Sequence, residues 1–270
     1  MNVEKLHFGL IGKDLSKSPS SRIHTFILNE FGVSCEFENF SVGKDGFDAT
    51  MRRLIGDFDG FFVTIPYKRD VMEYLNDVKG DALLFGAVNT VDTKTLTGYN
   101  TDGEGFLLMA KTAGISFAGK RVLVLGAGGS GRSTAVAVKN AGAEVCIYQR
   151  NREKLLETCA QLGLAPAERI EDGGYDILIN CTGVGMHDTE GLSPVGQGAF
   201  SGAETAIDLI YTPRESEFLR LARESGLKTL NGASMLFYQA YYADCFFLGK
   251  EPNLEEAKTF YKKYCLVWAE

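Results

Sequence analysis

A glycine-rich turn between an apolar run and a helical segment constrains the fold of this chain more than any other feature. The pattern GxGxxG is formed by Gly126, Gly128 and Gly131. It directly follows the apolar run 122–125, and a helical stretch, 132–141, comes after it. In such a unit, glycine lets the backbone approach a pyrophosphate closely, and the free N–H groups of the helix favour the anion. The pattern therefore predicts a dinucleotide site; the alternative is a glycine-rich packing turn. The residues expected to bind the dinucleotide here are Gly126, Gly128, Gly129, Ser130 and Gly131.

The segment after the next predicted strand, 145–148, is basic where an enzyme that binds NAD presents Asp or Glu to the ribose hydroxyls. A carboxylate there would repel the 2′-phosphate of NADP, whereas arginine offers a planar fork of donors and a fixed charge. The sequence therefore favours NADP as the cofactor. We expect it to contact Arg150, Asn151 and Arg152, which follow Gln149. The alternative is that these arginines form the solvated start of a helix.

Short apolar runs alternate with amphipathic segments along the chain, and this pattern is typical of α/β folds. The length of 270 residues is about twice that of a usual single domain. We predict an N-terminal α/β domain over 1–102, completed by C-terminal helices in 236–270, and a doubly wound, Rossmann-like domain over 103–235. The strands expected are 6–11, 35–40, 60–65, 87–91 and 96–99, then 122–125, 145–148, 177–180, 206–210 and 229–230. The helices expected are 23–31, 101–114 with a capping box of Thr101 and Glu104, 132–141, 235–248 and 254–267.

Charge and cysteine content exclude several classes of function. The formal net charge of −7 disfavours nucleic acid as a partner, because long phosphate polymers bind to a basic field. No apolar stretch reaches the roughly 18 residues of a membrane span. The six cysteines form no CxxC pair, and with three histidines they offer no zinc-ligand spacing, so we expect no metal site. We interpret the cysteines as reduced core thiols in a cytoplasmic protein that does not bind membranes.

Four polar groups stand at the ends of predicted strands or at the starts of helices in the first domain. Ser18 and Ser20 have the spacing that puts both hydroxyls on one side of an extended backbone, although a polar turn that caps the next helix is the simpler interpretation. Thr64 and Lys68 flank a proline that ends a strand, in a place where most lysines are merely solvated. Asn89 needs hydrogen-bond partners if it is buried. Asp102 could simply stabilise the first turn of a helix.

The order and spacing of these motifs resemble the shikimate dehydrogenases of aromatic amino-acid biosynthesis, and the resemblance covers nearly the whole chain. The segments that carry it are 9–12, 18–24, 63–68, 86–90, 100–105, 126–132, 208–213 and 232–239.

The resemblance implies NADPH-dependent, reversible reduction of 3-dehydroshikimate to shikimate, with Lys68 and Asp102 as the catalytic pair. An ammonium group can stabilise the charge that develops on a ketone oxygen and then supply the proton. By position in the family pattern, the substrate would contact Ser18, Ser20, Thr64, Asn89, Tyr211 and Gln239. The cofactor would also contact Gly232 and Met235.

The chain departs from the family pattern at four positions. A frequent histidine is replaced by Lys17, a proline by Ser21, an asparagine by Phe62 and a serine by Gly183. We expect Lys17 and Phe62 to reshape the rim of the substrate pocket. A dehydrogenase that acts on quinate or an aminoshikimate, a non-catalytic NADP sensor and a different NADP enzyme with the same architecture therefore stay open as alternatives. The oligomeric state expected is a monomer or a homodimer.

Overall fold

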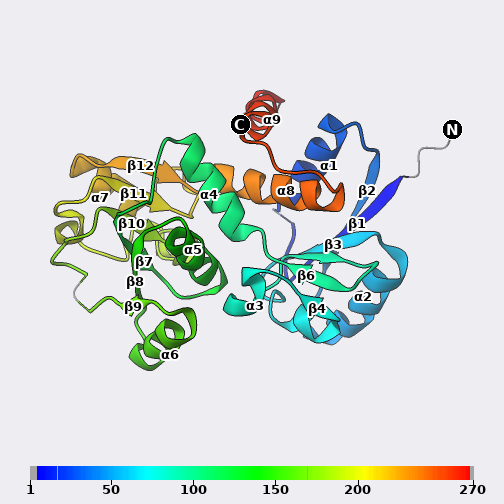
Figure 1. Cartoon of the computed structure of the whole chain (residues 1–270), viewed down its shortest axis with the longest axis horizontal. Coiled ribbons are helices and arrows are strands. Elements are labelled where there is room, and N and C mark those ends of the chain that lie inside the picture. The colour runs from blue at the N-terminus through cyan, green and yellow to red at the C-terminus, as the bar shows by residue number, and fades with distance from the viewer. Residues whose placement is uncertain (1–4, 17, 169, 268–270) are drawn as a thin grey trace. The chain divides into compact units, whose positions relative to one another are not determined.

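The computed structural model describes residues 5–16, 18–168 and 170–267, and in it the chain forms two α/β units (Figure 1). The first unit comprises residues 1–105 and 236–270, and the second comprises residues 106–235. The chain leaves the first unit within helix α4 (Asp102–Thr112) and returns to it within helix α8 (Ala233–Phe247). Each unit contains its own six-stranded sheet.

The sheet of the first unit has the strand order β2-β1-β3-β5-β6-β4. Its central strand β3 is buried along its whole length, as expected for a strand covered on both faces. Strand β1 is parallel to β2 and β3, whereas β5 is antiparallel to β3 and β6. The strands are β1 (Leu6–Gly12), β2 (Cys35–Ser41), β3 (Gly60–Val63), β4 (Asp77–Val78), β5 (Thr90–Asp92) and β6 (Thr97–Tyr99).

The helices of the first unit include two that the sequence patterns did not predict. Helix α2 (Lys44–Asp57) buries Phe47, Met51 and Leu54, which lie on one face because their spacing follows the helical period. The second is α3 (Asp81–Phe85), and a 3₁₀ helix, η1 (Asp70–Tyr74), precedes it. The others are α1 (Ser20–Glu30), α8 and α9 (Leu254–Val267).

Two local expectations for the first unit are wrong. Ser20 is the first residue of α1, and Pro19 before it has a ψ of 0°, so the backbone between Ser18 and Ser20 is not extended. The capping box of Thr101 and Glu104 is replaced by other contacts, because the Thr101 hydroxyl bonds to the side chains of Asn89 and Gln239. At Ser20 the start of α1 decides the backbone geometry. At Thr101 the side chains of Asn89 and Gln239, which are distant in sequence, decide the hydrogen bonds.

The sheet of the second unit is parallel throughout, with the order β12-β11-β10-β7-β8-β9. Counted along this unit, that order is 6-5-4-1-2-3, which is the order of a Rossmann fold. The fold class predicted from the sequence is confirmed. The strands are β7 (Arg121–Leu125), β8 (Glu144–Tyr148), β9 (Ala165–Pro166), β10 (Ile177–Asn180), β11 (Thr205–Asp208) and β12 (Lys228–Asn231). The helices are α5 (Gly129–Asn140), α6 (Arg152–Leu162) and α7 (Glu217–Glu224), with short 3₁₀ helices η2 (His187–Thr189) and η3 (Gln197–Phe200).

The order of the second sheet reverses between its neighbouring strands β7 and β10. In doubly wound sheets, ligands bind beyond the carboxyl ends of the strands at such a reversal. The glycine-rich turn that begins at Gly126 follows β7, and Thr182 follows β10 at the same edge. The topology therefore brings the predicted dinucleotide motif to the place where this fold binds ligands.

All six cysteines are free, as predicted, but only some of them are core residues. Cys159 and Cys245 are buried, whereas Cys35, Cys146 and Cys181 are partly buried. Cys265 is exposed near the end of α9, so its interpretation as a core thiol is wrong. Among the helices in the described part of the chain, none has the length and hydrophobicity needed to cross a membrane.

Candidate active site

Lys68 and Asp102, which are 34 residues apart in the chain, form an ion pair in the first unit. The Lys68 ammonium donates to Oδ2 of Asp102 at 2.5 Å, and the two side chains are 18% and 8% exposed. Lys68 lies in the segment after β3, and Asp102 is the first residue of α4. An ammonium group that is held by a carboxylate and still reaches solvent can exchange a proton with a bound molecule.

A backbone hydrogen bond and the side chain of Tyr67 hold the segment that carries Lys68 in place. The Lys68 carbonyl accepts a hydrogen bond from the N–H of Val88 at 2.7 Å. The preceding residue, Tyr67, is buried, stacks on Phe47 with ring centroids 4.4 Å apart and donates its hydroxyl to the carbonyl of Val42 at 2.6 Å. The base of the lysine side chain is therefore anchored from two sides, and only its flexible arm is free to adjust.

The buried amide of Asn89 organises the acidic partner. Its Nδ2 group donates to Oδ1 of Asp102 at 2.9 Å and to Oγ1 of Thr101 at 3.1 Å, and its Oδ1 accepts from the Thr101 N–H at 3.0 Å. Asp102 thus presents one carboxylate oxygen to Asn89 and the other to Lys68. No role was predicted for Asn100, whose Oδ1 accepts from the Asp102 N–H and whose amide donates to the carbonyl of Ala87. The one sequence feature that could have indicated this role is the position of Asn100, directly after a predicted strand and two residues before Asp102.

Gln239 of α8 joins the same cluster through its side-chain oxygen. That oxygen accepts from Asn89 at 3.3 Å and from the Thr101 hydroxyl at 3.4 Å. The side chain of Gln239 is half-buried. Gly105 permits the approach, because a Cβ at that position would lie 2.6 Å from the nitrogen of Gln239.

The two predicted serines lie together although the backbone between them is not extended. The Ser18 hydroxyl donates to Oγ of Ser20 at 3.2 Å, and both residues are half-buried at the start of α1. Thr64 is also half-buried and packs against Gly12, where a Cβ would lie 2.6 Å from the Thr64 methyl group. Tyr211 belongs to the second unit and is exposed. The contacts of these residues with a substrate stay predictions.

Phe62 does not line a pocket rim, which corrects the expectation from the sequence. It is buried on β3, where its ring stacks on that of His24 with centroids 3.7 Å apart. The Ser21 hydroxyl accepts a hydrogen bond from Asn39 at 3.3 Å, and Gly183 is exposed. Lys17, the other residue expected at the rim, lies outside the described residues.

The glycine-rich turn is built around positions that exclude a side chain. Gly126 has a φ of +98°, in the region that favours glycine, and a Cβ at Gly131 would lie 2.0 Å from the carbonyl oxygen of Gly126. Helix α5 begins at Gly129, earlier than predicted, so Ser130 and Gly131 belong to its first turn. Around Gly128 and Gly129 a Cβ would meet no atom within 4 Å, so this stretch leaves room for a ligand against the helix N-terminus.

The three basic or polar residues after β8 have different surroundings, although all are exposed. Asn151 caps α6, because its side chain accepts from the N–H of Lys154 at 3.0 Å. Arg152 pairs with Glu168 at 3.0 Å. Within the described residues, no hydrogen bond or ion pair engages the guanidinium of Arg150, and it is therefore the arginine best placed to receive a phosphate.

A buried polar network lies at the carboxyl edge of the second sheet, and the sequence patterns gave it no role. The carboxylate of Asp208 accepts from Asn180 at 3.0 Å, from the Ile210 N–H at 2.9 Å and from the Ser216 hydroxyl at 2.5 Å. Burial raises the pKa of Asp208 to about 6, although these hydrogen bonds oppose the shift. Asn180 and Asp208 are the last residues of the neighbouring strands β10 and β11. Their positions at the ends of two predicted strands could have indicated that their side chains meet. The network holds the segment from Asp208 to Ser216, which carries Tyr211.

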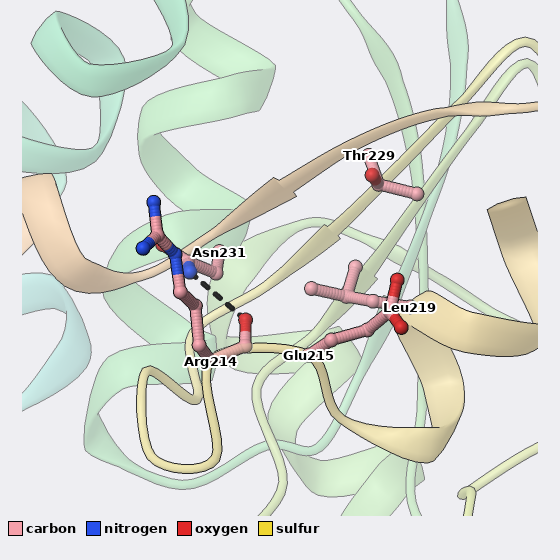
Figure 2. A pocket seen from close by; sticks show the side chains of 5 residues that line it. All are labelled: Arg214, Glu215, Leu219, Thr229 and Asn231. Carbon is pink, nitrogen blue, oxygen red and sulfur yellow. Dashed lines mark hydrogen bonds between the residues drawn. The ribbon is translucent and has the colours of Figure 1, made fainter.

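Gly232 directly follows β12, at the carboxyl edge of the second sheet. A Cβ at this position would lie 2.2 Å from the carbonyl oxygen of Leu209, and its carbonyl accepts from the N–H of Met235, which is buried. Nearby, a cavity of about 280 Å³ is lined by Arg214, Glu215, Leu219, Thr229 and Asn231. Figure 2 shows the amide of Asn231 donating to the carbonyl of Arg214 across it. None of the residues predicted to bind substrate or cofactor lines this cavity.

Comparison with known proteins gives consistent results over most of the chain. Residues 10–91 match the family model described as the shikimate dehydrogenase substrate binding domain. A shikimate dehydrogenase (NADP(+)) of Caldanaerobacter subterraneus is 36% identical over 251 residues, covering 87% of this chain and 89% of that protein.

Solved structures agree with the sequence comparison. The shikimate 5-dehydrogenase of Thermus thermophilus, in complex with NADP(H) and shikimate, is 31% identical, with a TM-score of 0.87 over 96% of this chain and 99% of that chain. The ligand-free 5-ketofructose reductase of a Gluconobacter strain is 30% identical, with a TM-score of 0.82 over 96% and 98% of the two chains. The fold alone thus does not fix the substrate. Identity above 30% across most of both chains nevertheless defines the relationship, and this chain belongs to the shikimate dehydrogenase family.

Proposed function

We propose that this chain is an NADP-dependent oxidoreductase that reversibly reduces 3-dehydroshikimate to shikimate in aromatic amino-acid biosynthesis. The observation that carries the proposal is the ion pair between Lys68 and Asp102. Lys68 lies within the segment that matches the substrate-binding family model, and the pair is the acid–base group that reduction of a ketone needs. The proposal assigns the acid–base chemistry and all the substrate contacts except Tyr211 to the first unit, and NADP binding to the second.

Reduction converts a ketone oxygen into a hydroxyl group, and Lys68 provides the proton. When bound, NADPH supplies the hydride that the ketone carbon accepts. As negative charge develops on the ketone oxygen, the Lys68 ammonium stabilises it by a hydrogen bond and then transfers one proton to it. Lys68 is left as a neutral amine, which regains a proton from solvent. In the reverse direction the neutral amine removes the proton of the substrate hydroxyl.

Asp102 keeps the Lys68 ammonium in place. Its carboxylate is oriented by the amide of Asn89, so Oδ2 points to the ammonium in a fixed direction. General acid–base assistance of this kind is typically worth about 10² to 10⁴ in rate.

The remaining predicted contacts bind the substrate without exchanging protons with it. The paired hydroxyls of Ser18 and Ser20 suit a carboxylate, because each can donate one hydrogen bond to it. Thr64, Asn89, Gln239 and Tyr211 would contact ring hydroxyls or the carboxylate. Asn89 already shares its amide hydrogens among protein partners, so we assign its larger contribution to the orientation of Asp102.

The second unit fits a dinucleotide with a 2′-phosphate. The open backbone at Gly128 and Gly129 forms the start of α5, whose first turn contains no acidic residue, so the free N–H groups of this helix can receive a pyrophosphate. The exposed guanidinium of Arg150 can pair with the 2′-phosphate through two parallel hydrogen bonds. Asn151, Arg152, Gly232 and Met235 complete the proposed cofactor site.

A second candidate function is reduction of a different cyclic or open-chain ketone with the same cofactor. The structural similarity to a 5-ketofructose reductase is the observation that favours it. Quinate and aminoshikimate belong to the same group of alternatives. A non-catalytic sensor is less consistent with the site, because a sensor has no need for an ion pair of lysine and aspartate that reaches solvent.

We further propose that the protein acts in the cytoplasm, as a monomer or a homodimer. The support for the compartment is that all six cysteines are free, as is usual where thiols are kept reduced.

Purified protein tests the proposal through the absorbance of reduced nicotinamide. We expect shikimate with NADP⁺ to give turnover at a higher kcat/KM than quinate, aminoshikimate or reduced 5-ketofructose with either NADP⁺ or NAD⁺. Turnover of one of the other substrates at a higher kcat/KM would replace the proposed substrate. Cofactor binding with no turnover of any of them would support the sensor.

A further inference from the structure

A buried pair of titratable side chains connects two helices of the first unit and takes no part in the chemistry described above. Nδ1 of His24, on α1, lies 2.7 Å from Oδ1 of Asp244, on α8, and the side chains are 1% and 0% exposed. Burial raises the pKa of the Asp244 carboxyl. Among the described residues, nothing forms a hydrogen bond with its other oxygen, Oδ2.

The ring of His24 is held in one plane by aromatic neighbours. It stacks on Phe62 of β3 and on Phe37 of β2, with interplanar angles of 24° and 17°. Because the ring plane is fixed, Nδ1 points in one direction, and Asp244 meets it there. The contact is therefore directional, unlike the apolar contacts around it.

Stability alone gives little reason for this pair. Removing two polar side chains from water costs about as much as their mutual attraction returns, and well-packed apolar residues of similar size are often at least as stable. What a directional contact adds is a fixed register between the elements that it joins, because packed apolar surfaces tolerate small slides more easily.

The two helices joined by the pair carry different parts of the proposed substrate site. Ser20 is the first residue of α1, one helical turn before His24, and its hydroxyl contacts that of Ser18. Gln239 lies on α8, five residues before Asp244, and its oxygen bonds to Asn89 in the cluster around Asp102.

We propose that His24 and Asp244 are positioning residues that lock α1 against α8, so that the serine hydroxyls and the Gln239 amide are held at one fixed spacing for the substrate. This inference rests on the proposed function. The pair touches neither the substrate nor the reacting atoms, and its loss should weaken substrate binding more than it slows proton transfer. The binding lost is equally strong in the ground state and in the transition state, so KM should rise while kcat changes little.

The main test variant replaces both polar side chains by apolar ones, as His24→Phe with Asp244→Leu. We expect this double variant to retain the wild-type thermal midpoint or exceed it. Its KM for shikimate should rise by about tenfold or more, with kcat within about threefold of wild type and the KM for NADP⁺ unchanged. An unchanged KM for shikimate in the folded double variant would overturn the inference.

Two single variants and one control make the test independent of folding of the double variant. Asp244→Asn retains the acceptor oxygen that faces His24, and it should keep the KM for shikimate near wild type, whereas Asp244→Leu should raise it. Equal KM values in both single variants would also overturn the inference. The control is Tyr241→Phe on the same helix, which removes partly buried hydrogen bonds to Asn253 and Glu256 but none to α1. A rise in KM as large in the control would show that any damage to α8 suffices.

The outcome separates this inference from the proposed function. Wild-type protein without turnover of shikimate would end the proposed function itself. Turnover by wild type, with the same KM in all the variants, would end only the role of His24 and Asp244.

Discussion

Gly105 of α4 lies directly against the backbone of Gln239 on α8, where a Cβ at Gly105 would come within 2.6 Å of the Gln239 nitrogen. Glycine inside a helix costs about 1 kcal/mol relative to alanine, so this position favours close approach over helix propensity. The approach brings the Gln239 oxygen to Asn89 and Thr101, next to the carboxylate of Asp102. The geometry of the acid–base pair thus depends on a residue without a side chain.

Gly105→Ala should therefore destabilise the protein although alanine is the better helix former. Because the methyl group would meet backbone atoms, which cannot rotate away, we expect the free energy of unfolding to fall by about 1 to 3 kcal/mol. We also expect kcat/KM for shikimate to fall. Urea unfolding and steady-state kinetics measure both effects. Gly56→Ala is the matched control, since Gly56 lies in α2 with open space around it, and this variant should be stabilised. Equal stabilisation of both variants would show that the contact at Gly105 is not tight.

Asn89→Leu should disorganise the acid–base pair without removing either member. The variant leaves Oδ1 of Asp102 and the hydroxyl of Thr101 without their shared donor. A buried acceptor that loses its partner costs about 1 to 3 kcal/mol, so both stability and kcat should decrease. Thermal unfolding and the rate at saturating shikimate test this. A stable variant with wild-type kcat would show that Asp102 needs no orientation by Asn89.

Arg150→Ala should weaken binding of NADP⁺ and leave that of NAD⁺ nearly unchanged. Hydrogen bonds to a charged group contribute about 1.5 to 3 kcal/mol, which corresponds to a rise in KM for NADP⁺ on the order of ten- to a hundredfold. Steady-state kinetics with each cofactor at saturating shikimate provide the measurement. The control is Lys154→Ala, which removes an exposed positive charge from the same helix start and should change neither KM. Equal losses for both cofactors in Arg150→Ala would contradict a contact with the 2′-phosphate.

Asp208 should make the stability of the second unit depend on pH in a defined window. Its pKa is about 6 in the folded protein, against an ordinary 3.8, so between these values the folded state holds a proton that the unfolded state has lost. The contribution of this group to stability is therefore complete below pH 3.8 and is lost as the pH rises through 6. At 1.36 kcal/mol per pH unit, the loss amounts to about 3 kcal/mol.

Asp208→Asn isolates this effect, because other carboxyl groups titrate equally in both proteins. We expect the variant to gain about 2 to 3 kcal/mol relative to wild type between pH 4 and pH 7.5, measured by urea unfolding at each pH. A difference between the two proteins that stays constant with pH would show that the pKa of Asp208 is not raised.

Much of the fold could be predicted from local patterns in the sequence. Strands β7, β8 and β10 of the second unit each contain a continuous apolar run. The turn after β7 needs glycine at position 126, because the backbone there has a positive φ. Helix α9 was predicted with its observed bounds because its apolar positions follow the helical period. Such features depend on neighbours within a few residues.

The predictions failed where residues distant in the sequence determine the contacts of a side chain. Phe62 was expected at a pocket rim, but α1 places His24 against its ring in the core. The hydroxyl of Thr101 fits a capping box by spacing, yet Asn89 and Gln239 take its hydrogen bonds. The partner of His24 lies 220 residues away, so no periodicity could indicate it.

In the proposed mechanism, Lys68 transfers the proton to the substrate while Asp102 holds the Lys68 side chain in place. The turnover rate of Lys68→Ala tests this division of roles most directly. The measurement is kcat at saturating shikimate and NADP⁺, together with the affinity for NADP⁺ determined by titration. The control is Lys79→Ala, since Lys79 forms a solvent-exposed ion pair with Asp77 in the same unit. We predict that Lys68→Ala lowers kcat by about 10² or more at unchanged NADP⁺ affinity, and that Lys79→Ala retains wild-type kcat. A Lys68→Ala variant that turns over shikimate at the wild-type rate would contradict the account.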